Sequence, residues 1–253
     1  IITSNTSSMM DYMEQLEKGG YVMIIPTACA VQQEKLPYES VVPLYNQKEE
    51  LIDDIYRRIS GYLTAVDVYP TLRNHQEEYI YYRTDTRLTG LGGYYIYTVL
   101  AKKLGLNPRG VEDFDVEHLT YDYYGNLYDL SPYRKVAGDR VSAYRFAAQQ
   151  RSYTVTHYDV QGDGRQYYTL YPKSRQQLFG AQEAILGGVS PVVDIEIDSP
   201  QKNYNQLLIF GDDSMQSYLP FLLVHYARVT FVDAANVTPA LLERVDPADY
   251  KQI

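Results

Sequence analysis

The sequence predicts a single α/β domain, residues 1–253, built on a parallel β-sheet. Two strand–helix–strand units, at residues 21–69 and 207–233, predict parallel pairing with right-handed crossovers. Between them, residues 107–205 alternate short β-prone runs with Gly, Asp and Pro turns. This texture indicates an inserted, mixed α+β segment with antiparallel hairpins, packed on the α/β core. A chain of 253 residues is long enough to bury one large core of this kind.

The first unit begins with an apolar strand at residues 21–27, YVMIIPT. A helix is expected over residues 46–63, with Asn46 as its N-cap. Within that helix, apolar residues recur at helical spacing, namely Ile52, Ile55, Ile59 and Leu63. The buried run AVDVY at residues 65–69 closes the unit as a second strand.

The stretch that follows predicts a short strand and then a helix. YIYY, at residues 79–82, is β-prone because Tyr and Ile favour extended backbone. Thr89 is the expected N-cap of a helix that carries Val99 and Leu100 and ends at Gly105.

The second unit consists of a strand LLIF at 207–210, a helix at 214–226 kinked at Pro220, and a parallel strand VTFVD at 229–233. The last residues, DYKQI, are expected to approach a further strand, so the chain is expected to be cut short there. Its abrupt start, IITSNTSS without an initiator Met, indicates that a leader or anchor has been removed.

Composition excludes several classes of function. The net charge is −9 and no segment concentrates Lys and Arg, so nucleic acid and anionic membranes are not expected partners. No run approaches the roughly 18 apolar residues of a membrane span. The single cysteine, Cys29, excludes an internal disulfide and a Cys-based zinc site. The four histidines show no metal-binding spacing, so neither a metal nor a cofactor is predicted.

The turn after LLIF offers the first candidate site, Gly211-Asp212-Asp213-Ser214. A nucleophile between a strand and a helix gains from exposed backbone N–H groups and from the positive end of the helix dipole. Asp213 occupies that position. Ser214 follows it and is expected to be the helix N-cap.

The second candidate site is the run Asp85-Thr86-Arg87-Leu88-Thr89, followed by Gly92-Gly93-Tyr94. It resembles the signature of the DHHW family, bacterial SGNH-hydrolase-like proteins related to the alginate O-acetyltransferases. The family motif reads Asp-His-His-Trp-Thr, and then a Gly-Ala-Tyr helix start. The resemblance continues in register through residues 21–37, 65–72, 122–128 and 207–233. It implies a three-layer α/β/α, SGNH-like (flavodoxin-like) fold.

The same resemblance exposes departures from the family's catalytic pattern. Its aspartate next to the nucleophile falls on Asp212, its catalytic serine on Asp213 and its catalytic histidine on Arg87, while the triad aspartate is retained as Asp85. A Gly-Gly-Asn segment that would lend an oxyanion donor falls on Gly187-Gly188-Val189. The degenerate triad positions are thus Asp85, Arg87 and Asp213, with Ser214 as fallback nucleophile and Asp212, Gly188, Val189 and Thr89 as candidates for lining a substrate cleft.

The replacements at two of these positions carry complementary charges, which predicts an ion pair between Arg87 and Asp213. Asp85 could hold the guanidinium from its other side. Arginine stays protonated, so it cannot replace histidine as a general base near neutral pH.

Three functional interpretations follow. The first is a catalytically inactive DHHW protein, exported to the bacterial cell surface, that binds a cell-surface glycan. The second is an active esterase or polysaccharide O-acetyltransferase that uses Ser214 with an unconventional base. The third is a surface protein-interaction module whose 28 tyrosines form a protein-binding face. Export and the polysaccharide link are implied by the resemblance alone.

Overall fold

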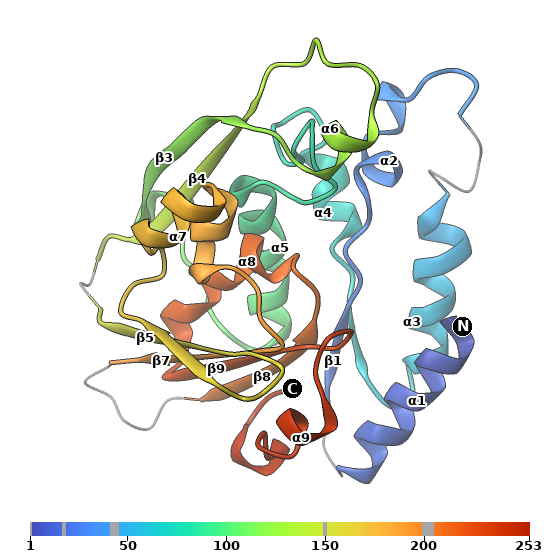
Figure 1. Cartoon of the computed structure of the whole chain (residues 1–253). Coiled ribbons are helices and arrows are strands. Elements are labelled where there is room, and N and C mark those ends of the chain that lie inside the picture. The colour runs from blue at the N-terminus through green and yellow to red at the C-terminus, as the bar shows by residue number, and fades with distance from the viewer. Residues whose placement is uncertain (1, 17–18, 41–45, 149–150, 199–204) are drawn as a thin grey trace.

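The computed structural model describes residues 2–16, 19–40, 46–148, 151–198 and 205–253 (Figure 1). The strands are β1 (Tyr21–Met23), β2 (Thr64–Val66), β3 (Phe114–Tyr123), β4 (Asp139–Phe146), β5 (Tyr153–Tyr158), β6 (Gly164–Tyr167), β7 (Val192–Ile197), β8 (Gln206–Gly211) and β9 (Arg228–Asp233). The α-helices are α1 (Ile2–Gln15), α2 (Ala28–Val31), α3 (Asp53–Ile59), α4 (Tyr69–Asn74), α5 (Gly90–Lys103), α6 (Asn126–Leu130), α7 (Lys173–Phe179), α8 (Met215–Leu222) and α9 (Pro239–Leu242). Shorter helical turns are η1 (Gln33–Lys35), the π-helical η3 (Lys48–Ile52), η4 (Val111–Asp113), η5 (Gln182–Gly187), η6 (Leu223–His225) and η7 (Pro247–Asp249).

The α/β class is confirmed, and both predicted parallel pairs are present. β1 pairs in parallel with β2, and β8 pairs in parallel with β9. Between β1 and β2, the short α2 and η1 precede the predicted helix, which is η3 continued by α3. Between β8 and β9, the helix is α8 continued by η6. Pro220 lies inside this second helix, whose α-helical part ends two residues later, at Leu222, and the kink expected there stays a prediction.

The predicted three-layer fold around one parallel core sheet is not confirmed. The main sheet has five strands in the order β6-β5-β7-β9-β8, and only the β8–β9 pair within it is parallel. The reason is that residues 107–205 contribute β5, β6 and β7 to the same sheet as β8 and β9. Strands β5 and β6 are joined by a short hairpin, which requires antiparallel pairing. Residues 149–150 and 199–204 of this segment lie outside the described residues, and its status as an insertion stays a prediction.

The predicted strand at 79–82 is wrong. Only a single antiparallel bridge forms there, between Tyr81 and Leu88. Ile80, Tyr81 and Tyr82 are instead buried in the main core, at 5% exposure or less. Their apolar character therefore reflects packing rather than membership of a sheet.

Helices α5 and α8 pack against each other in the middle of the molecule (Figure 1). Aromatic side chains of the two helices stack in the buried core, where the ring centroids of Tyr97 and Phe221 lie 5.6 Å apart. The close approach depends on Gly93, because a Cβ there would lie 1.9 Å from the Ser217 carbonyl oxygen. Gly93 and Ser217 are both in the first turns of their helices, so this contact brings the two helix N-termini, and the loops before them, together.

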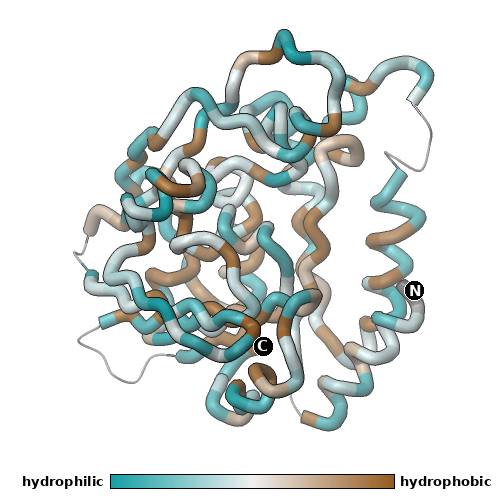
Figure 2. The backbone as a smooth tube through the Cα atoms, in the orientation of Figure 1, coloured by the Kyte–Doolittle hydropathy of each residue, from teal (hydrophilic) through white to brown (hydrophobic). Residues whose placement is uncertain are grey.

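Apolar residues follow the strands that cross the interior, whereas the peripheral helix α3 alternates between apolar and polar positions (Figure 2). Its buried Ile59 and Tyr56 face β1 and β2 in a satellite core with Met13 of α1. In the part of the chain that the structure describes, no helix has the length and apolar character needed to cross a bilayer.

Candidate functional site

The loop that carries Asp85 and Arg87 is anchored by a buried carboxylate. Asp139, at the start of β4, is 0% exposed. Its Oδ2 accepts hydrogen bonds from the Thr84 backbone N–H (2.8 Å) and hydroxyl (2.5 Å), and its Oδ1 accepts from the Arg83 N–H (3.0 Å). Burial alone would raise the pKa of Asp139, but these hydrogen bonds outweigh it and hold the pKa below its ordinary value. The ionised Asp139 carboxylate therefore holds the loop in place.

Asp85, a predicted site residue, is buried, at 2% exposure. A Cβ at Gly125 would lie 2.3 Å from Asp85 Oδ2, so only glycine permits the segment 122–128 to pass this close. From that segment, the Tyr123 hydroxyl donates a hydrogen bond to the same oxygen. The Asp85 carboxylate is thus enclosed by protein rather than open to a ligand.

Arg87 forms a bidentate salt bridge with this carboxylate. Arg87 Nε donates to Asp85 Oδ1 (3.0 Å) and Arg87 Nη2 donates to Asp85 Oδ2 (2.8 Å). The Arg87 backbone N–H also donates to Oδ1, at 3.0 Å. Two further acceptors complete the guanidinium's surroundings, Tyr123 Oη at 2.7 Å and Gln216 Oε1 at 3.2 Å. This bidentate geometry is the strong form of an arginine–carboxylate bond.

The electrostatics agree with this geometry. Burial would raise the pKa of Asp85, but hydrogen bonds from Arg87 and Tyr123 outweigh it, so the pKa lies below its ordinary value. Burial would likewise lower the pKa of Arg87, yet the bond to Asp85 raises it further above its ordinary value. Arg87 consequently remains charged and cannot accept a proton from a nucleophile.

Asp213 takes part in this cluster more loosely. The predicted ion pair with Arg87 is present, but Arg87 Nη1 lies 3.4 Å from Asp213 Oδ2, longer than a charge-assisted hydrogen bond. The Asp213 side chain is 51% exposed, so the pair is not buried. Partial burial and the nearby Asp212 and Asp85 raise the pKa of Asp213, and the attraction of Arg87 does not cancel this. Asp85, not Asp213, is therefore the main partner of Arg87.

The prediction that the Ser214 side chain caps α8 is wrong. Ser214 occupies the N-cap position, but its side chain makes no capping hydrogen bond. The exposed Asp212 instead closes the turn before the helix, because its Oδ1 accepts from the Ser214 backbone N–H at 2.9 Å. A carboxylate two residues ahead of the amide closes this turn better than a hydroxyl on the same residue could. Ser214 is partly buried and faces an apolar groove.

Each of the four histidines is engaged away from Ser214 in the described part of the chain. His75 contacts Glu78 at 2.6 Å, His118 contacts Ser142 at 3.0 Å, and His157 contacts Ser190 at 3.0 Å. His225 contacts Tyr97 Oη at 2.9 Å, and burial lowers its pKa to about 4. Among the described residues, no histidine is therefore positioned as a base for Ser214. Within the same residues, no group of three or more His, Cys, Asp or Glu side chains could hold a metal ion.

The remaining predicted residues have different surroundings. Thr89 caps α5 as predicted, accepting from the Gly92 N–H at 3.3 Å, and its hydroxyl donates to the Tyr79 carbonyl at 2.7 Å. Gly188 adopts a left-handed conformation (φ 95°), beside Arg175 and Glu183. Val189 is partly buried against the main core.

Two residues of the site, Gln216 and Tyr123, were not identified from the sequence. Gln216 is 1% exposed and connects Arg87 to η5, because its Nε2 donates to the Ile185 carbonyl (3.0 Å) and the Gln182 carbonyl (3.3 Å). A signal was available: Gln216 is an amide in a helix whose eight residues are all buried. Such a residue needs partners in the interior.

One consequence for pH dependence follows. Because the folded-state pKa of Asp85 is depressed, its contribution to stability is present above the unfolded pKa of about 3.9 and is lost as pH falls through the folded value. We expect Asp85→Asn to lose most stability relative to the native chain near pH 7, and the difference to shrink below about pH 4. Urea unfolding at several pH values measures this. A difference that stays constant from pH 7 to pH 2 would show that the Asp85 charge is irrelevant.

One family model matches this chain in sequence, and several solved structures resemble it in fold. The DHHW family model, described as DHHW protein, matches residues 2–229. A DHHW family protein from Eubacterium siraeum has a similar structure, with a TM-score of 0.75 and 23% identity over 90% of this chain and 75% of that one. Bacillus cereus PatB1 with a sulfonyl adduct gives a TM-score of 0.71 and 14% identity, over 92% of this chain and 78% of that one. A second PatB1 structure gives 0.71 and 16%, over 94% and 82%.

Among curated proteins, none matches the chain in sequence. The structural similarities, all below 25% identity, establish the fold. The family model spans most of the chain, and it includes both the Asp85–Arg87 loop and the turn at Asp212-Asp213-Ser214. This chain therefore belongs to the DHHW family.

Proposed function

We propose that this chain is a catalytically inactive DHHW protein that works outside the cytoplasm, at the bacterial cell surface, as a glycan-binding domain. One observation carries the proposal: Arg87, at the position of the family's histidine, is locked onto Asp85 by a bidentate bond at 3.0 and 2.8 Å. An acyl transfer needs a nucleophile and a base within hydrogen-bond reach of each other. Arg87 supplies no base, and Asp213 replaces the serine.

A patch beside this site supports binding rather than catalysis. The segment 121–133 exposes large apolar side chains, with Tyr121 at 65%, Leu130 at 81% and Tyr133 at 61%. Gly125, within the same segment, abuts Asp85. Tyrosine faces suit sugar rings because they combine apolar area with a hydroxyl. The patch therefore borders the candidate functional site, where we propose that a glycan binds.

The catalytic half of the proposal predicts an absence of turnover. We expect hydrolysis of p-nitrophenyl acetate to remain at the background rate, and to be the same in the native chain and in Ser214→Ala. A sulfonyl fluoride is a second probe, since PatB1 has been solved with a sulfonyl adduct. Labelling or turnover that disappears in Ser214→Ala would instead establish the active alternative, an esterase or O-acetyltransferase using Ser214.

The binding half predicts an effect of the exposed tyrosines. On an array of bacterial surface polysaccharides, we expect the native chain to retain a glycan that the Tyr121→Ala, Tyr133→Ala double variant retains at least about tenfold more weakly, the effect of losing two stacking contacts. Tyr168→Ala, which removes an equally exposed tyrosine (75%) next to β6, is the matched control. Silence of the native chain on the array, combined with capture of a specific surface protein that depends on Tyr121 and Tyr133, would favour the protein-interaction alternative.

A further inference from the structure

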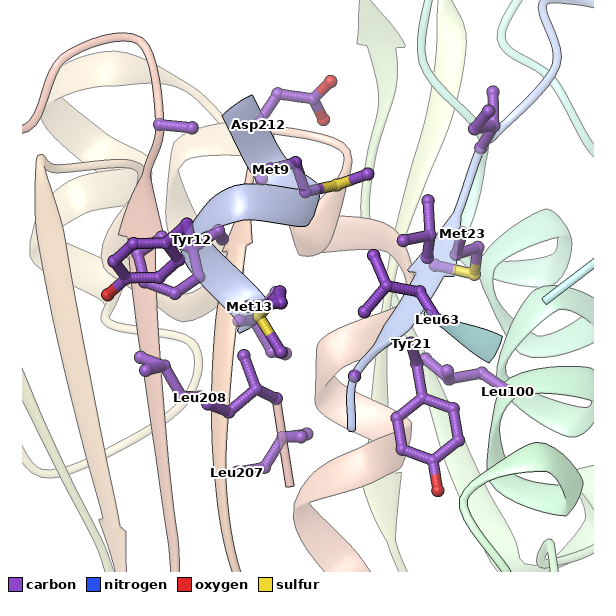
Figure 3. A pocket seen from close by; sticks show the side chains of 18 of the residues that line it. Met9, Tyr12, Met13, Tyr21, Met23, Leu63, Leu100, Leu207, Leu208 and Asp212 are labelled. Carbon is purple, nitrogen blue, oxygen red and sulfur yellow. The ribbon is translucent and has the colours of Figure 1, made fainter. Parts of the chain in front are cut away.

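An apolar groove of about 940 Å³ separates β1 from β8. Apolar side chains of both strands form its walls, and Met9, Tyr12 and Met13 of α1 cover it (Figure 3). Tyr12 closes one side by an edge-to-face contact with Phe210, with ring centroids 5.9 Å apart. The groove runs between the edges of two separate sheets, the β1–β2 pair and the five-stranded sheet that ends in β8.

Residues 251–253 occupy one end of this gap. Leu208 N–H donates to the Gln252 carbonyl at 3.0 Å, and Leu207 and Gln252 form a parallel bridge. On the other side, Tyr21 N–H donates to the Ile253 carbonyl at 2.9 Å. A single extended segment therefore bonds to both edges at once, which shows that the gap is one strand wide at this end.

Beyond this end, the same two edges continue without such a partner. Alternate residues of a strand present their N–H and C=O groups to the same side. Since Tyr21 and Leu208 bond into the gap, Met23 of β1 and Phe210 of β8 must present theirs to the groove as well. The residues between them face the other way: the Thr64 N–H donates to the Gly20 carbonyl and the Ala234 N–H to the Gly211 carbonyl. Val22 and Ile209, each two residues away from these acceptors, therefore direct their backbone groups to β2 and β9. No hydrogen-bond partner for the Met23 or Phe210 N–H exists among the residues that the structure describes.

These features define the chemistry of an occupant. The side chains around the groove are mostly apolar, and the main polar groups available are backbone donors and acceptors repeated along both edges. A fatty acyl chain would bury the apolar walls but would leave those backbone groups unpaired, which is costly. An extended peptide satisfies both requirements, as in recognition by strand addition.

We propose that one extended peptide strand, apolar on both faces, occupies this groove parallel to β8, along the path on which residues 251–253 lie. The strand joins the two sheets into one, in the order β2-β1-strand-β8-β9-β7-β5-β6. Its far end reaches Asp212 and Ser214, which line the same groove. The strand thereby becomes a wall of the candidate functional site, whether or not that site is catalytic.

Two extended forms of the whole chain test this. In the first, Val-Ile-Val-Ile-Val is appended after Ile253, about the length of an average strand. In the second, five prolines are appended, which are also apolar but cannot donate a backbone hydrogen bond to either edge. We expect the first extension to slow hydrogen exchange of the Met23 and Phe210 amides by about a hundredfold or more, as burial in a sheet ladder does, and to suppress ANS fluorescence. The proline form should resemble the native chain.

Two results would overturn the proposal. Equal protection by both extensions would show that apolar bulk, not strand pairing, fills the groove. If palmitate displaces ANS while the Val-Ile extension leaves Met23 and Phe210 exchange unchanged, the groove is a lipid site. Neither result depends on ester hydrolysis. The occupant of the groove and the proposed lack of catalysis are therefore tested independently of each other.

Discussion

We expect Arg87→Ala to lower the free energy of unfolding by about 3–5 kcal/mol, the cost of breaking a buried ion pair by removing one partner. The reason is Asp85, which is 2% exposed and would lose both hydrogen bonds that it accepts from the Arg87 side chain. Equilibrium unfolding in urea measures the change.

Two variants serve as controls for Arg87→Ala. Arg87→Lys keeps the charge but cannot reproduce the bidentate salt bridge, so it should lose part of the stability. Asp213→Ala should cost less than about 1 kcal/mol, because that side chain is 51% exposed and its contact with Arg87 is 3.4 Å long. A loss below about 1 kcal/mol in Arg87→Ala would show that the Asp85 carboxylate has adequate partners without it.

The second large effect is expected at Gly93, where helices α5 and α8 touch. A Cβ at this position would lie 1.9 Å from the Ser217 carbonyl oxygen and 2.3 Å from its carbonyl carbon. The obstacle is helix backbone, which cannot move aside as a flexible side chain can. We expect Gly93→Ala to lower the free energy of unfolding by about 3 kcal/mol or more, measured by urea or thermal unfolding.

Gly61→Ala is the matched control, because nothing lies within 4 Å of its added Cβ. It should change stability by no more than about 0.5 kcal/mol. If Gly93→Ala behaved like Gly61→Ala, α5 and α8 would be free to separate. The convergence of the Asp85 loop with the turn at Asp213 would then need another explanation.

Much of the fold could be predicted because local signals agreed with the final packing. Apolar runs on both sides of an amphipathic or buried helix predicted both parallel strand pairs, β1–β2 and β8–β9. Thr89 alone predicted where α5 begins. Strand direction in the rest of the sheet could not be predicted. β7 runs antiparallel to β9, and local sequence carries no signal for the direction of a pairing between strands that are distant in sequence. The run at Tyr81 failed for a related reason, because buried loop and buried strand have the same apolar composition.

The complementary charges of the site could be predicted from the sequence, but the distances and contacts between its side chains could not. Complementary replacements pointed to a contact between Arg87 and Asp213, and that contact exists at 3.4 Å. Sequence spacing could not show that Asp85, which is only two residues from Arg87, would bind the guanidinium more tightly than Asp213 does. That conformation depends on Gly125 and Tyr123, which arrive from another segment.

In the proposed inactive protein, the residues at the family's triad positions form a structural ion pair centred on Asp85. Double-mutant cycles test it most directly, with Arg87→Ala combined first with Asp85→Ala and then with Asp213→Ala, each read by urea unfolding. We expect a coupling energy of about 2–3 kcal/mol between Arg87 and Asp85, and a coupling energy of less than about 1 kcal/mol between Arg87 and Asp213. A stronger coupling to Asp213, or none to Asp85, would contradict it.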